Sequence, residues 1–149
     1  MIQKIKLSSN DRVKDKLDEL VSYHRELVED LPERDEFKQE RLVKRGIEKT
    51  IELIADTIVD IALIIISERG LKKPEDSRDA LSVLEENKIL TKKVAGKIKD
   101  LISFRNLLVH RYGKIKEDLE YTNISENSED IILFVKEIEI SLKDKLKVQ

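Results

Sequence analysis

Four polar side chains that could take part in chemistry fall within eight residues of one another: Arg105, Asn106, His110 and Tyr112. An imidazole titrates close to neutral pH, so His110 can accept or donate a proton. The planar guanidinium of Arg105 matches the oxygens of a phosphate. Asn106 and His110 are four residues apart, so they are neighbours if the segment is helical. This cluster indicates a site that holds a phosphate and moves protons.

The surroundings of Arg105 leave its role open between two interpretations. On a helical wheel the residue falls in the middle of an apolar stripe, where an unpaired charge is costly. One interpretation is structural, a buried ion pair with Asp56 or Asp60 on another helix. The other places the guanidinium in a cleft, where it binds a phosphate. The residues of the stripe are Ile98, Leu101, Ile102, Leu108, Val109 and Tyr112.

The charge distribution around this cluster is uneven. The chain of 149 residues has 29 basic and 31 acidic residues and a net charge of −2. The window 88–116 alone has nine basic residues and one acidic residue, Asp100, so its net charge is +8. A basic stripe on an acidic body is typical of a surface that binds a polyanion. The alternative is a solvated helix face whose lysines pair with acidic side chains nearby.

Composition and motifs exclude several classes of protein. With no cysteine, the chain has no disulfide scaffold, thiolate zinc site or cysteine nucleophile. Phosphate-binding loops, dinucleotide fingerprints and histidine-based metal motifs are also missing, so we expect no metal and no cofactor. The second histidine, His24, falls on the apolar stripe of the first predicted helix. We interpret it as a packed or half-exposed core residue.

Hydrophobic periodicity predicts helices along almost the whole chain. A chain with four glycines and two prolines has few turns, which favours an all-α antiparallel bundle of four or five helices. We expect a single domain over residues 1–149. Thr91 is the predicted cap of the fourth helix, and Pro32 and Gly70 are predicted helix ends. The predicted helices cover residues 11–30, 34–69, 76–86, 91–114 and about 131–146, and the polar stretch 116–129 is expected to include a loop.

The long second helix has apolar residues on two faces. One wide stripe is formed by Ile47, Ile51, Ile54, Ala55, Ile58, Ala62, Ile65 and Ile66. The opposite side combines apolar and acidic residues, namely Leu53, Leu63, Ile64, Asp56 and Asp60. Two buried faces predict either a helix at the centre of its own bundle or a second contact with another chain.

No segment approaches the ~20 apolar residues of a membrane span, and the longest apolar run is Ile61–Ile66. The N-terminal segment MIQKIKLSSNDRVKDK has no apolar signal core. We therefore expect a cytoplasmic protein with no membrane partner.

The segment from Arg105 to Tyr112 reads R-N-x-x-V-H-x-Y and resembles the R-x4-H-x-Y signature of HepT-like toxins. These toxins are a branch of the HEPN ribonucleases (higher eukaryotes and prokaryotes nucleotide-binding). The resemblance covers most of the chain, because the long second helix, the Arg78–Ala80 helix and the motif occur in the family's usual order. It implies a HEPN-like helical fold.

The resemblance also implies an activity. It predicts a metal-independent endoribonuclease that acts as a homodimer, with two motifs facing each other across the seam. His110 would be the general base or acid, and Arg105 would hold the scissile phosphate, with Asn106 in support. RNA supplies its own nucleophile, the 2′-hydroxyl, so such a protein needs only to move protons and stabilise charge. Lys97, Arg111 and Lys114 are candidate RNA-binding residues.

Tyr112 has a separate implied role. HepT-like toxins are paired with an MntA-like minimal nucleotidyltransferase antitoxin, in a toxin–antitoxin system of type II or VII. The antitoxin transfers AMP to the tyrosine of the H-x-Y motif, which adds negative charge and bulk beside His110. From the residues alone, we interpret Tyr112 as an ordinary packed aromatic at the end of the apolar stripe. The alternative function is a non-catalytic helical partner that binds nucleotide or acts as a scaffold for a nucleotidyltransferase.

Overall fold

The computed structural model describes residues 9–110 and 116–148, with side chains described from 11 to 144. Over these residues the chain is helical, with no strand, which confirms the predicted all-α bundle. The helices are α1 (Ser9–Asp30), α2 (Arg34–Gln39), α3 (Arg41–Glu68), α4 (Ser77–Glu86), α5 (Lys92–His110), α6 (Glu117–Asn127) and α7 (Glu129–Val148).

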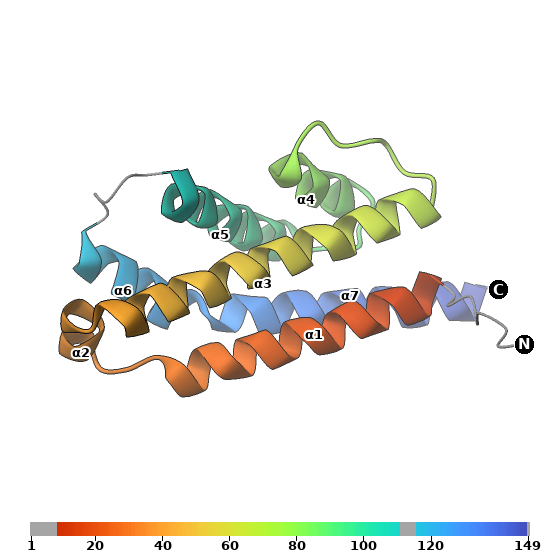
Figure 1. The fold of residues 1–149 in the computed structure, drawn as a ribbon. Coiled ribbons are helices and arrows are strands. Elements are labelled where there is room, and N and C mark those ends of the chain that lie inside the picture. The colour runs from red at the N-terminus through yellow and green to blue at the C-terminus, as the bar shows by residue number, and fades with distance from the viewer. Residues whose placement is uncertain (1–8, 111–115, 149) are drawn as a thin grey trace, which may run out of the picture.

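Three long helices, α1, α3 and α7, form the body of the bundle (Figure 1). The helix α3 runs across the front, with α1 below it and α4 and α5 above it (Figure 1). The short helices α2 and α6 pack together at one end, opposite the end where α1 begins and α7 ends. None of the described helices is long and apolar enough to cross a membrane.

The predicted second helix is interrupted once. Glu40 has an extended conformation (φ −95°, ψ 91°), so residues 34–69 form α2 and α3 and not one continuous helix. The interruption turns α2 so that Phe37, which is fully buried, packs against Tyr121 of α6 with 5.4 Å between ring centroids. Helical periodicity continues across Glu40, which is why the sequence alone suggested one helix.

The predicted end of α3, both predicted ends of α4 and the predicted start of α5 are confirmed, while the predicted end of α5 at residue 114 lies outside the described residues. Gly70 follows α3 with φ +62°, and the amide of Leu71 donates to Ile66 O at 2.9 Å, which closes the helix in a Schellman motif. At the start of α5, Thr91 Oγ1 accepts a hydrogen bond from the amide of Val94 at 3.3 Å. The carboxylate of Glu137 on α7 accepts hydrogen bonds from the Thr91 amide and hydroxyl.

The polar stretch 116–129 differs from the prediction, because most of it is the helix α6. Its buried side is narrow and includes Glu120, Tyr121 and Ile124. Tyr121 anchors the helix by donating its hydroxyl hydrogen to Pro32 O at 2.6 Å. A helix with so few apolar positions has little hydrophobic periodicity, and this explains why the sequence suggested a loop.

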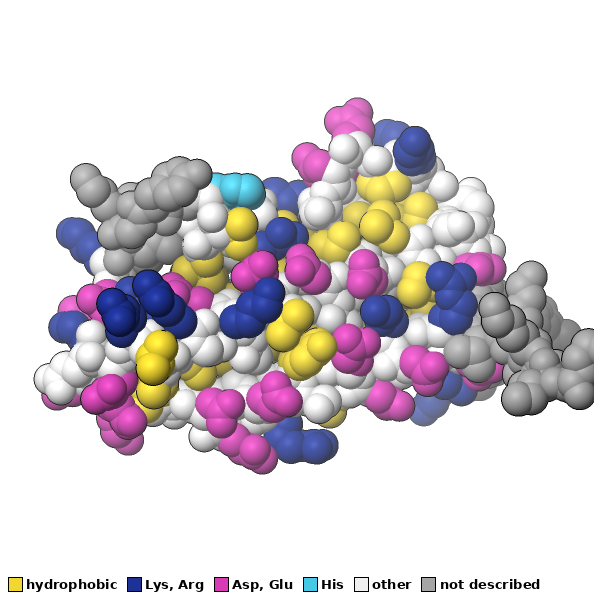
Figure 2. Space-filling model, viewed as in Figure 1, with side chains coloured by type: hydrophobic (Ala, Val, Ile, Leu, Met, Phe, Trp, Pro, Cys, Tyr) yellow, Lys and Arg dark blue, Asp and Glu magenta, His cyan; other side chains and the backbone are white. Residues whose placement is uncertain are grey.

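The two faces of α3 have different environments. The predicted apolar stripe from Ile47 to Ile66 is buried throughout, at 5% exposure or less. On the other face Leu63 is 43% exposed, and Asp56 and Asp60 are exposed. Figure 2 shows acidic and hydrophobic side chains along this open side of the molecule. The structure therefore excludes, for the described residues, the interpretation that α3 is enclosed on all sides by its own bundle.

Candidate functional site

The last turns of α5 carry the three described residues of the predicted site. Asn106 and His110 are exposed, one turn apart at the C-terminal end of the helix. The side chain of Arg105 is 19% exposed and points toward α3. Tyr112, Arg111 and Lys114, predicted as the modified and RNA-binding residues, lie outside the described residues. The described part of the site is therefore an arginine at the α3–α5 contact and an exposed histidine five residues later on the same helix.

The partner of Arg105 is Asp56. Its Oδ1 lies 3.4 Å from Arg105 Nη2. Asp60, the other candidate, instead forms an ion pair with Lys16 of α1, at 3.5 Å between Oδ2 and Nζ. Of the two carboxylates that the sequence left open, Asp56 is thus the one at the site. The two acids are one helical turn apart, so the choice depended on the placement of α5 along α3.

The ion pair lies at the surface and is not buried in the core. Asp56 has a side-chain exposure of 53%, so its carboxylate remains hydrated. Arg105 Nε is buried and has no hydrogen-bond partner among the described residues. A buried N–H group without a partner costs about 1–3 kcal/mol. The guanidinium is therefore oriented by Asp56, and only the part of it that remains accessible can contact a second anion. This geometry lies between the two interpretations of Arg105, because the arginine is mostly buried but its partner is hydrated.

The described lysines of the window 88–116 form no ion pair. Among the described residues, none of the six lysines in the window 88–116 lies within 4.0 Å of a carboxylate, and Arg105 is the one basic residue of the window that does. The alternative interpretation, a helix face whose lysines pair with acidic side chains nearby, is therefore wrong for the described residues of the window. The six lysines are Lys88, Lys92, Lys93, Lys97, Lys99 and Lys116.

Arg78 of α4 fixes the position of the helix that carries the site. Its Nη1 donates a hydrogen bond to Lys99 O at 2.8 Å and another to the hydroxyl of Ser103. Ser103 is two residues before Arg105, so this contact sets how α5 lies against α4. This contact was not predictable from the sequence, because an exposed arginine in a short helix gives no signal of its partner.

Two other predictions concern His24 and metal binding. His24 is half-buried, and burial lowers its pKa, as expected for a core histidine outside the site. Among the residues that the structure describes, no group of three or more histidine, aspartate or glutamate side chains is arranged to hold a metal ion.

Comparison with known families gives a match over residues 15–138 to the family described as ribonuclease HepT-like. Among curated proteins, the chain is similar to mRNA nuclease HepT from Shewanella oneidensis, with 25% identity over 100 residues that cover 67% of this chain and 75% of the relative. It is also similar to a putative RNase from Archaeoglobus fulgidus, with 24% identity over 121 residues that cover 81% and 89% of the two chains.

Solved structures show the same fold. The tri-AMPylated HEPN toxin of Shewanella oneidensis, solved in complex with an MNT antitoxin, superposes with a TM-score of 0.82 at 22% identity over 87% of this chain and 98% of the toxin. YutE, a cytosolic protein of unknown function from Bacillus subtilis, superposes with a TM-score of 0.74 at 21% identity over 89% and 92% of the two chains.

Proposed function

The chain belongs to the ribonuclease HepT-like family, and we propose that it is a metal-independent endoribonuclease, the toxin of a toxin–antitoxin pair. The observation that carries this proposal is the state of Arg105. A guanidinium that is 19% exposed and oriented by one hydrated carboxylate can present its accessible edge to a phosphodiester oxygen as a second partner. The lysines along α5 that form no ion pair would attract the RNA backbone to this helix.

The proposed chemistry requires few groups. The 2′-hydroxyl of the RNA attacks the adjacent phosphorus, and the bond to the 5′-oxygen of the next nucleotide breaks. His110, exposed at the end of α5, removes the proton from the hydroxyl or delivers one to the leaving oxygen. Arg105 offsets the negative charge that develops on the phosphorane oxygens. Asn106, one turn before His110, orients the imidazole or the phosphate.

One chain supplies one such histidine, and acid–base catalysis uses two proton carriers. We therefore propose a homodimer in which the second copy of the chain contributes the second histidine. Apolar side chains beside the site support this arrangement. Val109 follows Arg105 by four residues and is 43% exposed, and Leu63 follows Asp56 by seven residues and is also 43% exposed. Both spacings place these side chains on the same helix faces as the site residues.

The antitoxin partner in this proposal is a minimal nucleotidyltransferase. The support is the solved complex of a HEPN toxin with an MNT antitoxin, in which the toxin is tri-AMPylated. In this chain Tyr112, two residues after His110, is the proposed acceptor of AMP. Adenylate two residues after His110 would add negative charge and bulk to the motif and compete with the RNA phosphate. Both molecules would meet in the cytoplasm, where RNA is available.

The proposal is tested by incubating the purified protein with RNA in EDTA between pH 5 and 9. We expect cleavage by the wild-type protein and a loss of at least 100-fold in His110→Ala and Arg105→Ala, since general acid–base groups contribute about 10²–10⁴-fold. His24→Ala serves as the matched control, because this half-buried histidine of α1 lies outside the site. Cleavage by both site variants at the wild-type rate would contradict the proposal.

A protein that binds ATP or a nucleotidyltransferase but cleaves no RNA would support the alternative, a non-catalytic partner. A second experiment therefore follows adenylate transfer from ATP to the toxin by a co-encoded nucleotidyltransferase, using intact-mass spectrometry. We expect adducts of AMP mass on the wild-type chain and their loss in Tyr112→Phe, while Tyr121→Phe, a control on α6, keeps them.

A further inference from the structure

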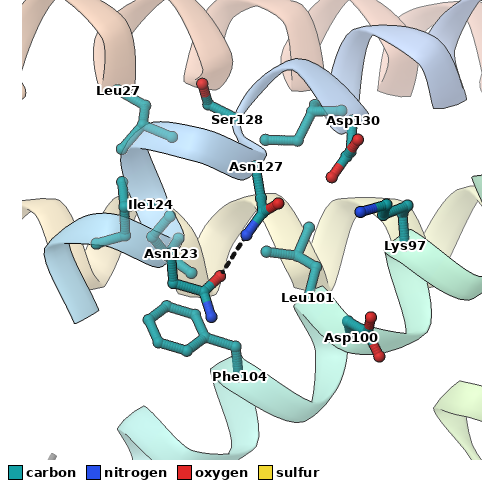
Figure 3. A pocket seen from close by; sticks show the side chains of 12 residues that line it. Leu27, Lys97, Asp100, Leu101, Phe104, Asn123, Ile124, Asn127, Ser128 and Asp130 are labelled. Carbon is teal, nitrogen blue, oxygen red and sulfur yellow. Dashed lines mark hydrogen bonds between the residues drawn. The ribbon is translucent and has the colours of Figure 1, made fainter. Parts of the chain in front are cut away.

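A pocket of about 260 Å³ lies between α5, α6 and α7, and it is separate from the Arg105–Asp56 pair. Figure 3 shows that its floor is apolar and its rim is polar. The floor is formed by Leu27, Ile51, Leu101, Phe104, Ile124 and Ile131. Phe104 immediately precedes Arg105 in α5, so the pocket and the candidate site share one helix.

The rim combines six polar side chains, those of Lys97, Asp100, Asn123, Asn127, Ser128 and Asp130. Asn127 Nδ2 donates to Asn123 Oδ1 at 3.0 Å, which leaves the amino group of Asn123 and the carbonyl of Asn127 without a partner among the described residues. Lys97, Asp100 and Asp130 form no ion pair with any described residue. Lys97 extends its amine toward the middle of the pocket between the two carboxylates in the view of Figure 3.

Size and charge limit what the pocket can hold. Pockets for drug-sized ligands have volumes of about 300–1,000 Å³, so this smaller one suits a single ring system. Two carboxylates against one ammonium give the rim a formal charge of −1, which disfavours a phosphate group. An apolar floor with hydrogen-bond donors and acceptors around its rim instead suits a flat heterocycle, and in an RNA-binding protein that heterocycle is a base.

We propose that this pocket binds the guanine base of a nucleotide next to the bond that is cleaved, an inference that rests on the proposed function. Guanine has two adjacent N–H donors on its Watson–Crick edge, N1–H and the N2 amino group, and a carboxylate can accept both. Its O6 and N7 are acceptors for an ammonium such as Lys97. Adenine, cytosine and uracil lack the adjacent pair of donors. Asp100 or Asp130 therefore selects guanine, and Lys97 completes the contact.

Nucleosides test the pocket without involving Arg105, because they have no phosphate. The full-length protein is titrated with guanosine and with adenosine while the side-chain amide signals of Asn123 and Asn127 are followed by NMR. We expect guanosine to shift these signals saturably and adenosine to bind at least tenfold more weakly. In Asp100→Asn/Asp130→Asn and in Lys97→Met we expect guanosine affinity to fall about tenfold or more. The control variants Asp18→Asn and Lys14→Met, both exposed on α1, should bind as the wild type does.

Equal binding of the two nucleosides, or shifts that the pocket variants do not change, would overturn the proposal. A second arm uses two RNA oligonucleotides that differ by guanine or adenine at one position beside the cleaved bond. Preferential cleavage of the guanine RNA that disappears in Asp100→Asn/Asp130→Asn supports the assignment to RNA. Guanosine binding with base-indifferent cleavage overturns that assignment and leaves a pocket for free guanine nucleotides. If no RNA is cleaved at all, the proposed function fails, while the nucleoside titration still decides what the pocket binds.

Discussion

Arg105 and Asp56 lie 3.4 Å apart, yet the arginine is 19% exposed and the aspartate 53% exposed. The pair therefore joins a mostly buried cation to a hydrated anion. This asymmetry gives the two residues different roles. Asp56 stabilises and orients the guanidinium, because the apolar side chains around Arg105 provide no negative charge. The accessible part of Arg105 retains the capacity to bind another anion.

The asymmetry predicts unequal effects on stability. In Arg105→Ala the remaining carboxylate is solvated, so the free energy of unfolding should fall by no more than about 1 kcal/mol. In Asp56→Ala the guanidinium loses its described anionic partner while it stays mostly buried, and we expect a loss of about 1–2 kcal/mol. Thermal and urea unfolding of both variants measures the difference. A loss of 3–5 kcal/mol in Arg105→Ala would instead indicate a structural buried ion pair and would weaken the phosphate-binding interpretation.

The exposed apolar residues beside the site predict how the chain self-associates. Leu63→Glu adds a charge to the open face of α3, which already carries Asp56 and Asp60, so it should dissociate a dimer that uses this face. Sedimentation equilibrium should show a shift from dimer to monomer, and RNA cleavage should fall with it. Leu133→Glu on α7, where the leucine is 38% exposed, is the matched control and should remain dimeric. A Leu63→Glu variant that stays dimeric would place the seam elsewhere.

Glu120 predicts a pH dependence of stability. Its side chain is 1% exposed, and burial together with the neighbouring Glu48 raises its pKa to about 8. The folded state therefore favours the protonated carboxyl, while the unfolded chain ionises at its ordinary value of 4.5. The stabilisation is complete below pH 4.5 and is lost as the pH rises toward 8.

Glu120→Gln keeps the shape and removes the charge. Its melting temperature should exceed that of the wild type by an amount that grows from pH 5 to pH 8. One pKa unit corresponds to about 1.4 kcal/mol, so the gain at pH 8 should be a few kcal/mol, or on the order of 5–10 °C. Glu126→Gln, at an exposed position of the same helix, should show no such trend. A constant difference between wild type and Glu120→Gln across this pH range would contradict the account.

Lys88 predicts a stabilising substitution. It follows the end of α4 with φ +58°, and the amide of Ile89 donates to Leu84 O at 2.9 Å, so Lys88 occupies the position that glycine usually takes in a Schellman motif. Because a left-handed conformation strains an L-residue, Lys88→Gly should stabilise the fold by about 0.5–1 kcal/mol. Lys93→Gly, inside α5, should destabilise it by a similar amount. Differential scanning calorimetry compares the two variants, and stabilisation by neither would refute this interpretation of Lys88.

The sequence predicted most of the fold because its long helices have strong hydrophobic periodicity. The stripe from Ile47 to Ile66, the Thr91 cap and the Gly70 end are all confirmed, and the family match confirms the resemblance seen in the motif from Arg105 to Tyr112. The break at Glu40 and the helix α6 were not predictable from periodicity. Each depends on a tertiary contact of Tyr121, with Phe37 in one case and with Pro32 in the other.

The candidate site was predictable only in part, for a similar reason. Residue types and spacing selected Arg105, Asn106 and His110, but the choice of Asp56 over Asp60 required the position of α5 along α3. The pocket beside Phe104 combines side chains from helices that are distant in sequence, so no local pattern indicates it. The catalytic roles of the three motif residues stay predictions.

The most direct test of the central claim uses an RNA oligonucleotide with a single 2′-deoxynucleotide at the cleaved position. If His110 and Arg105 only move protons and stabilise charge while the RNA provides the nucleophile, the wild-type protein in EDTA should cut the unmodified RNA to a 2′,3′-cyclic phosphate end. It should leave the substituted bond intact. Cleavage of both oligonucleotides at the same rate would contradict this mechanism.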